Sequence, residues 1–186
     1  MDDKQIIGLF FERSEAAISA VQKKYSSYCF SIANNILHEK SEAEESVNDT
    51  YLAAWNCIPP NNPENLAAFL GKLTRNISLK KLRNRTAKKR GGGETALILD
   101  EIEECFTAYD NVENQLILSE LVDILNDFLE ELPVSERRVF IRRYWYFDSI
   151  DAICKRTGYS QSKIKSMLLY ARQKLRNYLE SEGIEL

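Results

Sequence analysis

Apolar residues recur at three- and four-residue steps along almost the whole chain. That spacing places them on one face of an amphipathic α-helix. The longest such stripe, between residues 14 and 37, is made of Ile18, Val21, Tyr25, Tyr28, Ile32 and Ile36. Alternating runs of β-branched residues bounded by turn dipeptides, which are typical of strands, do not occur in the sequence. The pattern therefore predicts an all-α protein.

The first 90 residues are predicted to form four helices. The first two cover about 3–12 and 14–37. Ser41 followed by Glu44 has the spacing of a capping box, so a third helix is expected to begin there and to stop before the prolines at 59 and 60. Asn62 as cap and Pro63 at the first helical position then open a fourth helix.

The second half of the chain is also predicted to be helical. An amphipathic stripe from Leu118 to Leu132 ends at Pro133, and Ser135 can cap the next helix. A short helix over 149–157, a turn at Gly158 and a long final helix starting at residue 160 follow. This order predicts a helix-turn-helix, in which the second helix enters the DNA major groove.

Three consecutive glycines at 91–93 separate the two halves. Glycine has no side chain to pack and has high backbone entropy, so this run predicts a break between domains. The predicted architecture is two helical domains joined by a flexible linker, the C-terminal one a helix-turn-helix. The boundaries are 1–90 for the first domain, 91–112 for an acidic linker and 113–186 for the second domain.

The formal net charge of −3 conceals segments of opposite sign. Residues 71–90 carry nine bases and no acid, residues 94–131 carry twelve acids and no base, and residues 155–179 carry seven bases and no acid. Two basic helices suit a polyanion, because each phosphate that they neutralise releases a counterion. Two alternatives stay open: a solvated helix end for the first segment, and an ordinary helical hairpin with a solvated basic face for the second.

Composition disfavours several other classes of protein. Apolar runs fall short of the ~18 residues that span a membrane, and Met1-Asp2-Asp3 lacks the bases of a signal peptide, so we expect a cytoplasmic protein without membrane insertion. The four cysteines lie far apart and His38 is the single histidine, so we expect reduced thiols, no disulfide, no metal and no cofactor. Without a nucleophile and base or a Gly-rich phosphate loop, no enzyme activity is expected.

An acidic group early in the third helix has two interpretations; its members are Glu42, Glu44, Glu45 and Asp49. A carboxylate metal site inside a helical bundle would need histidine or further inward acids, which the sequence does not offer. A surface for a partner protein fits better, with Asn48 and Trp55 nearby.

Taken in order, these motifs resemble those of the extracytoplasmic-function sigma factors, the smallest group of bacterial RNA polymerase sigma subunits. Residues 41–55 look like the family's acidic helix ending in alanine-tryptophan. The resemblance implies that this helix docks on the β′ clamp helices of core RNA polymerase. The implied docking residues are Glu45, Asn48, Asp49, Leu52 and Trp55.

Residues 69–83 are similar to the family's helix that binds the minus-ten promoter element, with a preceding loop that holds a flipped base. The implied minus-ten contacts are Asn61, Asn62, Lys72, Arg75, Asn76, Lys80 and Arg83.

The C-terminal segments look like the domain that binds the minus-thirty-five element. Its implied contacts are Ser160, Gln161, Ser162, Lys163, Lys165, Ser166, Tyr170 and Arg172. Further implied partners are the β flap of the polymerase, promoter DNA and, as in many members, an anti-sigma factor.

The sequence thus predicts a sigma factor that binds core polymerase and directs promoter-specific transcription initiation. The alternative is a stand-alone helix-turn-helix regulator whose N-terminal domain is a sensor or dimerisation module. The first basic segment argues against that alternative, because such a module does not need it.

Overall fold

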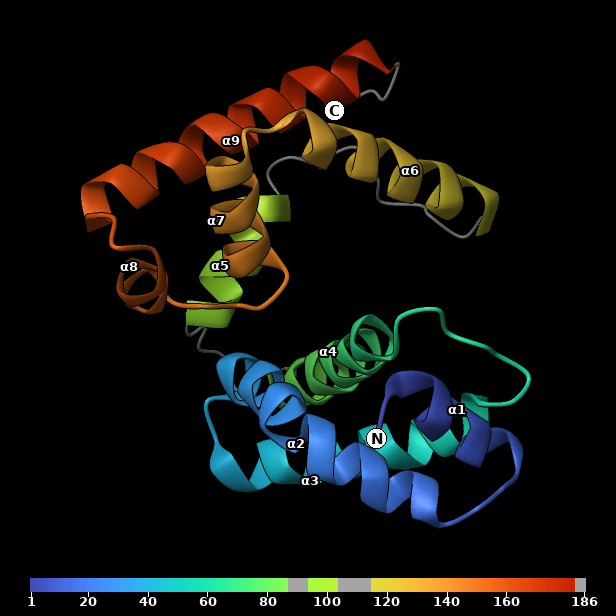
Figure 1. Ribbon diagram of the computed structural model, residues 1–186. Helices are drawn as coiled ribbons and strands as arrows, with labels where there is room; N and C mark the ends of the chain where they lie inside the picture. The colour runs from blue at the N-terminus through green and yellow to red at the C-terminus, as the bar shows by residue number, and fades with distance from the viewer. Residues whose placement is uncertain (87–93, 104–114, 183–186) are drawn as a thin grey trace. The chain divides into compact units, whose positions relative to one another are not determined.

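The computed structural model describes residues 1–86, 94–103 and 115–182 (Figure 1). Over these residues every regular element is an α-helix, which confirms the all-α prediction. The helices are α1 (Asp3–Phe11), α2 (Ala16–Leu37), α3 (Lys40–Cys57), α4 (Leu66–Thr86), α5 (Glu94–Glu103), α6 (Gln115–Glu131), α7 (Val134–Tyr144), α8 (Ile150–Thr157) and α9 (Gln161–Ser181). The chain divides into two compact units, Met1–Gly91 and Gly92–Leu186.

Helix α2 is the centre of the N-terminal unit and contacts α1, α3 and α4. Its predicted apolar stripe faces inward, with Val21, Ile32 and Ile36 almost inaccessible to solvent. Complete burial of such a side chain stabilises the fold by about 1.5–3 kcal/mol. The stripe therefore accounts for the position of α2 between its neighbours.

A polar contact joins α3 to α4 inside the same core. Thr50 Oγ1 lies 3.1 Å from Thr74 Oγ1, and both residues are fully buried. Each hydroxyl also reaches a carbonyl of its own helix, at 2.7 Å from Ser46 O and 2.8 Å from Leu70 O. Because buried hydroxyls are costly unless they are hydrogen-bonded, this pair favours one register between the two helices.

Gly71 allows a close approach of α4 to α2. A Cβ at this position would lie 2.5 Å from Tyr28 Oη, which is shorter than side-chain contacts allow. The absence of a side chain at Gly71 therefore helps to set the distance of the basic helix from the core.

The start of α3 differs from the sequence prediction. Glu39 is the N-cap, and its carboxylate accepts hydrogen bonds from Ser41 N at 3.1 Å and Glu42 N at 2.7 Å. The Ser41 hydroxyl donates to the same carboxylate at 2.7 Å. The predicted capping box at Ser41 is wrong, because the longer Glu39 side chain takes the free amides of the first turn.

Two further helix starts were also predicted wrongly. Asn65 Oδ1 accepts from Ala68 N at 2.9 Å, so Asn65 caps α4 where Asn62 was expected. The N-cap of α7 is Pro133, which has no side-chain cap hydrogen bond, where Ser135 was expected. In both cases the predicted cap lies within three residues of the observed one, so the helices themselves were found correctly.

The caps of α8 and α9 and the turn between them agree with the sequence prediction. Ser149 Oγ accepts from Ala152 N at 3.1 Å and caps α8. Gly158 ends α8 with φ of 74°, a left-handed conformation that glycine adopts without strain. Ser160 Oγ accepts from Lys163 N at 3.3 Å and caps α9. The buried side chains that hold this unit together include Ile153, Ile164, Leu168 and Leu175.

The segment predicted as a flexible linker contains a helix, and this is a difference from the prediction. Helix α5 covers ten residues of the 91–112 segment and contacts α7 of the C-terminal unit. Ile98 of α5 is 1% exposed, so the helix buries an apolar side chain. The rest of the predicted linker, residues 91–93 and 104–112, lies outside the described part of the chain.

Candidate protein and nucleic-acid interfaces

Helix α3 presents an acidic and apolar face to solvent. The side chains of Glu45 and Asp49 are 67% and 45% exposed, and Leu52 is 60% exposed. Asn48 is also exposed. These residues are three and four positions apart, so they share one side of the helix. An exposed leucine among carboxylates suits contact with another molecule.

Lys81 of α4 neutralises part of this acidic face. Its Nζ lies 2.9 Å from Asp49 Oδ2 and 3.2 Å from Glu45 Oε2. Burial alone would lower the pKa of Lys81, but hydrogen bonds to Asp49 and Glu45 outweigh burial and raise that pKa. Lys81 therefore stays charged and joins the two helices. This pairing could not be predicted from the sequence, because Lys81 lies far from Glu45 and Asp49 along the chain.

Trp55, at the end of the acidic helix, is held by α1 and the turn that follows it. Its ring lies 6.3 Å from the ring of Phe10, centroid to centroid, and the Arg13 guanidinium lies 5.4 Å from the indole centroid. Arg13 Nη1 also donates to Trp55 O at 2.6 Å. Trp55 is half-buried, so its contacts within the unit leave only part of the ring for a partner.

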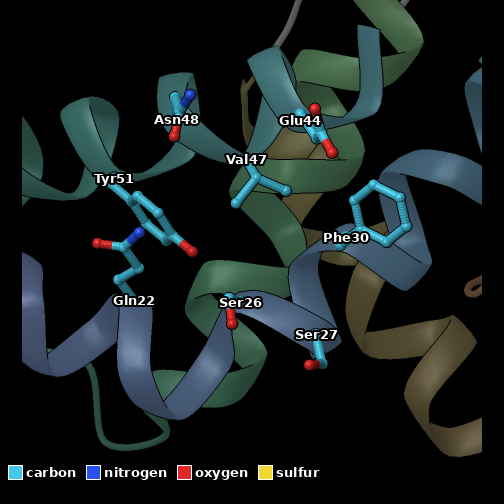
Figure 2. Close-up of a pocket in the computed structure, with 8 residues that line it drawn as sticks. All are labelled: Gln22, Ser26, Ser27, Phe30, Glu44, Val47, Asn48 and Tyr51. Atoms are coloured by element: carbon cyan, nitrogen blue, oxygen red, sulfur yellow. The ribbon is translucent and has the colours of Figure 1, made fainter. Parts of the chain in front are cut away.

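A groove of about 500 Å³ runs between α2 and α3 beside this face (Figure 2). Figure 2 shows Gln22 and Ser26 of α2 opposite Asn48 and Tyr51 of α3. The Tyr51 hydroxyl is buried without a hydrogen-bond partner among the described residues, and burial raises its pKa to about 12. Of the predicted docking residues, only Asn48 lines this groove.

The outer side of α4 carries a basic stripe. Lys72, Asn76, Lys80 and Arg83 are all exposed and recur at steps of three and four residues. Such a stripe can follow a nucleic-acid backbone, and an asparagine can add contacts to bases. Residues 87–90, with the last three bases of the predicted segment, lie outside the described residues.

Other bases of the α4 segment are turned toward the protein. Arg75 is half-buried. Its pKa is lowered mainly by burial and to a smaller extent by the nearby positive charge of Arg83. Arg85 Nη1 pairs with Glu42 Oε2 at 2.8 Å, and its Nη2 donates to Leu37 O at 3.1 Å. Only part of the basic segment is therefore presented to a ligand.

The loop before α4 keeps its two predicted contact residues accessible. Asn61 and Asn62 are both exposed. Asn61 Nδ2 donates to Cys57 O at 3.0 Å, so its side chain folds back onto the end of α3. Asn62 is therefore the more accessible of the two amides for an incoming base.

The start of α9 exposes seven of the eight predicted contact residues. These are Ser160, Gln161, Ser162, Lys163, Lys165, Ser166 and Tyr170.

Two of these side chains are oriented by neighbours. Gln161 Nε2 donates to Asp151 Oδ1 of α8 at 2.6 Å, and Lys163 Nζ lies 3.8 Å from the ring centroid of Tyr159. Neither Asp151 nor Tyr159 was identified from the sequence, because the contacts depend on how the turn places α8 against α9.

Arg172 is placed differently from the other predicted contacts of α9. Its side chain is 19% exposed, its Nη1 donates to Tyr144 Oη at 2.7 Å, and the same nitrogen lies 3.6 Å from Glu101 Oε2. Tyr144 Oη donates to Glu101 Oε2 at 3.1 Å, and the buried Arg143 lies 3.4 Å from Glu101 Oε1. Burial raises the pKa of Tyr144, which keeps its hydroxyl protonated as a donor.

Arg172 thus belongs to an internal network that ties α9 and α7 to Glu101 of α5. A guanidinium engaged in this way is not available to a DNA phosphate while α5 remains bound. The sequence did not reveal the network, because Glu101 lay in a segment expected to be flexible.

Within the described ranges, no group of histidine, cysteine or acidic side chains could hold a metal ion. Cys29, Cys57 and Cys154 are free thiols, and Cys105 lies outside those ranges. None of the helices in the described part of the chain is both long enough and apolar enough to cross a membrane.

Comparison with protein families identifies the class of this protein. The family model of the ECF sigma factors matches residues 24–181 and so reaches across both compact units. The chain belongs to the ECF sigma factor family. A search of curated proteins returned no match. Sigma factors are non-enzymatic regulators that act in transcription initiation, which assigns this chain a role in that process.

Proposed function

We propose that this chain binds core RNA polymerase and directs it to particular promoters. The observation that carries the proposal is the pairing of surfaces in one chain. An acidic face on α3 lies next to a basic stripe on α4, and a second unit carries a helix-turn-helix with an exposed polar and basic start. Family membership supports the same conclusion for the chain as a whole.

Polymerase docking is assigned to the acidic face of α3, with the β′ clamp helices as its target. Glu45 and Asp49 supply charge, and the exposed Leu52 supplies apolar area for the centre of the contact. Lys81 must share the two carboxylates with the partner, which moderates the charge that the partner meets. The same face is open to an anti-sigma factor, which would then compete with polymerase.

The minus-ten element is assigned to α4 and the loop before it, which makes residues 1–90 a sigma-2-like domain. The exposed bases of α4 suit the DNA backbone, and Asn62 lies in a loop that can receive a base taken out of the stack. Extraction of one base costs a few kcal/mol, which contacts in the loop must offset.

The minus-thirty-five element is assigned to the first turns of α9. This helix belongs to a sigma-4-like domain at 113–186, and we expect that domain to contact the β flap of the polymerase. Gln161, Lys163 and Lys165 are the exposed side chains best suited to base edges and phosphates. Each domain alone would bind DNA weakly. Polymerase fixes their relative position, so the second contact becomes intramolecular and binding becomes bivalent.

The docking assignment is tested by competition for core polymerase against a labelled reference sigma factor. Asp49→Lys reverses a charge on the docking face and is expected to reduce competition at least tenfold. Glu15→Lys, which reverses an exposed acid just before α2, is the matched control and should compete like the wild type. Equal competition by Asp49→Lys and wild type, with both folded, would show that α3 is not the docking helix.

A further inference from the structure

The groove between α2 and α3 has a lining that is partly polar and partly apolar. Its volume of about 500 Å³ falls within the range of about 300–1,000 Å³ that is usual for small-molecule sites. The lining residues are Gln22, Ser26, Ser27 and Phe30 of α2 and Glu44, Val47, Asn48 and Tyr51 of α3. Five of these eight side chains carry an amide or a hydroxyl group. The groove is therefore large enough for a small organic molecule and offers it several hydrogen bonds.

Tyr51 gives the strongest reason to expect a ligand in this groove. The residue is 5% exposed, and its hydroxyl is buried without a hydrogen-bond partner among the described residues. Burial raises the pKa of this phenol to about 12, so the hydroxyl stays protonated and can donate. In Figure 2 the Tyr51 ring reaches from α3 toward α2, beside the Gln22 amide. Because a buried donor without an acceptor costs free energy, an acceptor atom supplied by a ligand would stabilise the site.

The charge of the groove disfavours an anion. Glu44 is the one ionic side chain of its lining, and none of the eight lining residues is a base. The Glu44 side chain is 58% exposed and lies 3.7 Å from Lys40 Nζ, so solvent and a lysine offset its charge. An organic cation would gain little from a carboxylate in that position, and it could not accept the hydrogen bond of Tyr51. The groove therefore favours a neutral ligand that carries acceptor oxygens.

A neutral sugar combines the groups that this lining requires. Each sugar hydroxyl both donates and accepts hydrogen bonds, as do the amides of Gln22 and Asn48 and the hydroxyl of Ser26. The faces of a sugar ring carry C–H groups, which pack against apolar and aromatic side chains such as Val47 and Phe30. A sugar can thus use both the polar and the apolar parts of the groove.

We propose that this groove binds a neutral monosaccharide or disaccharide. One sugar oxygen accepts the hydrogen bond of the Tyr51 hydroxyl, which becomes accessible when the exposed Gln22 side chain beside it turns away. Asn48 lines the groove and also lies on the face that we assign to polymerase docking. A bound sugar therefore covers part of that face and lowers the affinity for polymerase, a consequence that rests on the proposed function.

Binding is tested by isothermal titration calorimetry and thermal unfolding of the full chain with glucose, galactose, mannose, N-acetylglucosamine, trehalose and sucrose. At least one of these sugars should bind the wild type saturably, and Tyr51→Phe and Ser26→Ala should each weaken that binding by about tenfold. Tyr178→Phe, which removes a tyrosine hydroxyl from the C-terminal unit, is the control and should bind like the wild type. Without sugar, Tyr51→Phe should unfold at no lower a temperature than the wild type, because it removes a buried donor that has no partner.

Four results would overturn the inference. The first is the absence of saturable binding of any of these sugars. The second is an equal rise in unfolding temperature for all variants, which is the general effect of an excluded osmolyte. The third is a lower stability of Tyr51→Phe without sugar, which would show that ordered water already satisfies the hydroxyl. The fourth is saturable binding of choline or inorganic phosphate in place of a sugar, which would show that the groove selects an ion.

Competition for core polymerase separates this inference from the proposed function. The bound sugar should reduce competition by the wild type and leave competition by Tyr51→Phe unchanged. If the sugar binds but does not alter competition, the consequence for docking is refuted. If the chain binds the sugar but not polymerase, the proposed function fails and the sugar site stands.

Discussion

Replacement of Gly71 by alanine tests the close contact between α4, which carries the basic stripe, and Tyr28 of α2. The added Cβ would lie 2.5 Å from Tyr28 Oη and 3.3 Å from Tyr28 Cζ. Favourable carbon contacts lie at about 3.5–4.0 Å, so the ring or the helix must move by roughly 1 Å. Because α4 carries the proposed minus-ten contacts, such a movement would also displace the DNA-binding stripe.

The expected change is the difference between two opposing terms. Overpacking of this kind costs about 1–3 kcal/mol, whereas replacing glycine by alanine in a helix gains about 1 kcal/mol of helix propensity. We therefore expect Gly71→Ala to lower the free energy of unfolding by about 1 kcal/mol. Gly8→Ala in α1 is the matched control, because a Cβ there meets nothing within 4 Å, and it should raise stability by up to about 1 kcal/mol.

Urea unfolding followed by Trp55 fluorescence measures both changes, in a Trp145→Phe background that removes the other tryptophan. Tyr28→Phe should reduce the cost of Gly71→Ala, because it removes the atom that the new Cβ meets at the shortest distance. Equal stabilisation by Gly71→Ala and Gly8→Ala would refute the close contact between α2 and α4.

Three further predictions concern other contacts. Glu101→Gln weakens the network that holds α5, so amide hydrogen exchange in α5 should become faster, whereas Glu136→Gln should leave α5 unchanged. Ser160→Ala removes the cap of α9 and should cost about 1 kcal/mol in unfolding of the C-terminal unit, restored in part by Ser160→Asp. The hydrogen bond from Lys24 lowers the pKa of Asp3, so this carboxylate stabilises the fold above about pH 4 and loses its effect as pH falls below that. Asp3→Asn should accordingly reduce the loss of stability on acidification.

Features decided by neighbouring residues could be predicted from the sequence. The caps of α8 and α9 depend on Ser149 and Ser160 and on amides three residues away, and the turn depends on the left-handed conformation of Gly158. The apolar stripe of α2 faces inward as its period requires. The prediction failed at the start of α3, where two side chains could cap the helix. The sequence pattern does not show that Glu39, and not Ser41, accepts the hydrogen bonds of the first-turn amides.

Features that depend on contacts distant in sequence could not be predicted. The charge pattern treats all bases of a segment alike, yet Lys81 and Arg85 face acids of α3, whereas Lys80 and Arg83 face solvent. Acidic composition and the glycines at 91–93 suggested a flexible linker, but α5 buries Ile98, and its Glu101 contacts Arg143 and Tyr144, which lie more than 40 residues away. Arg172 is an example: it was predicted to contact DNA, but its guanidinium contacts Glu101 of α5.

The most direct test of the central claim is transcription by core RNA polymerase with the purified full chain on genomic DNA fragments, followed by mapping of the transcript 5′ ends. The account predicts transcripts at discrete start sites that require the chain and that are lost when Asp49→Lys replaces the wild type. A folded chain that binds neither polymerase nor template, and adds no start site above core polymerase alone, would contradict the account.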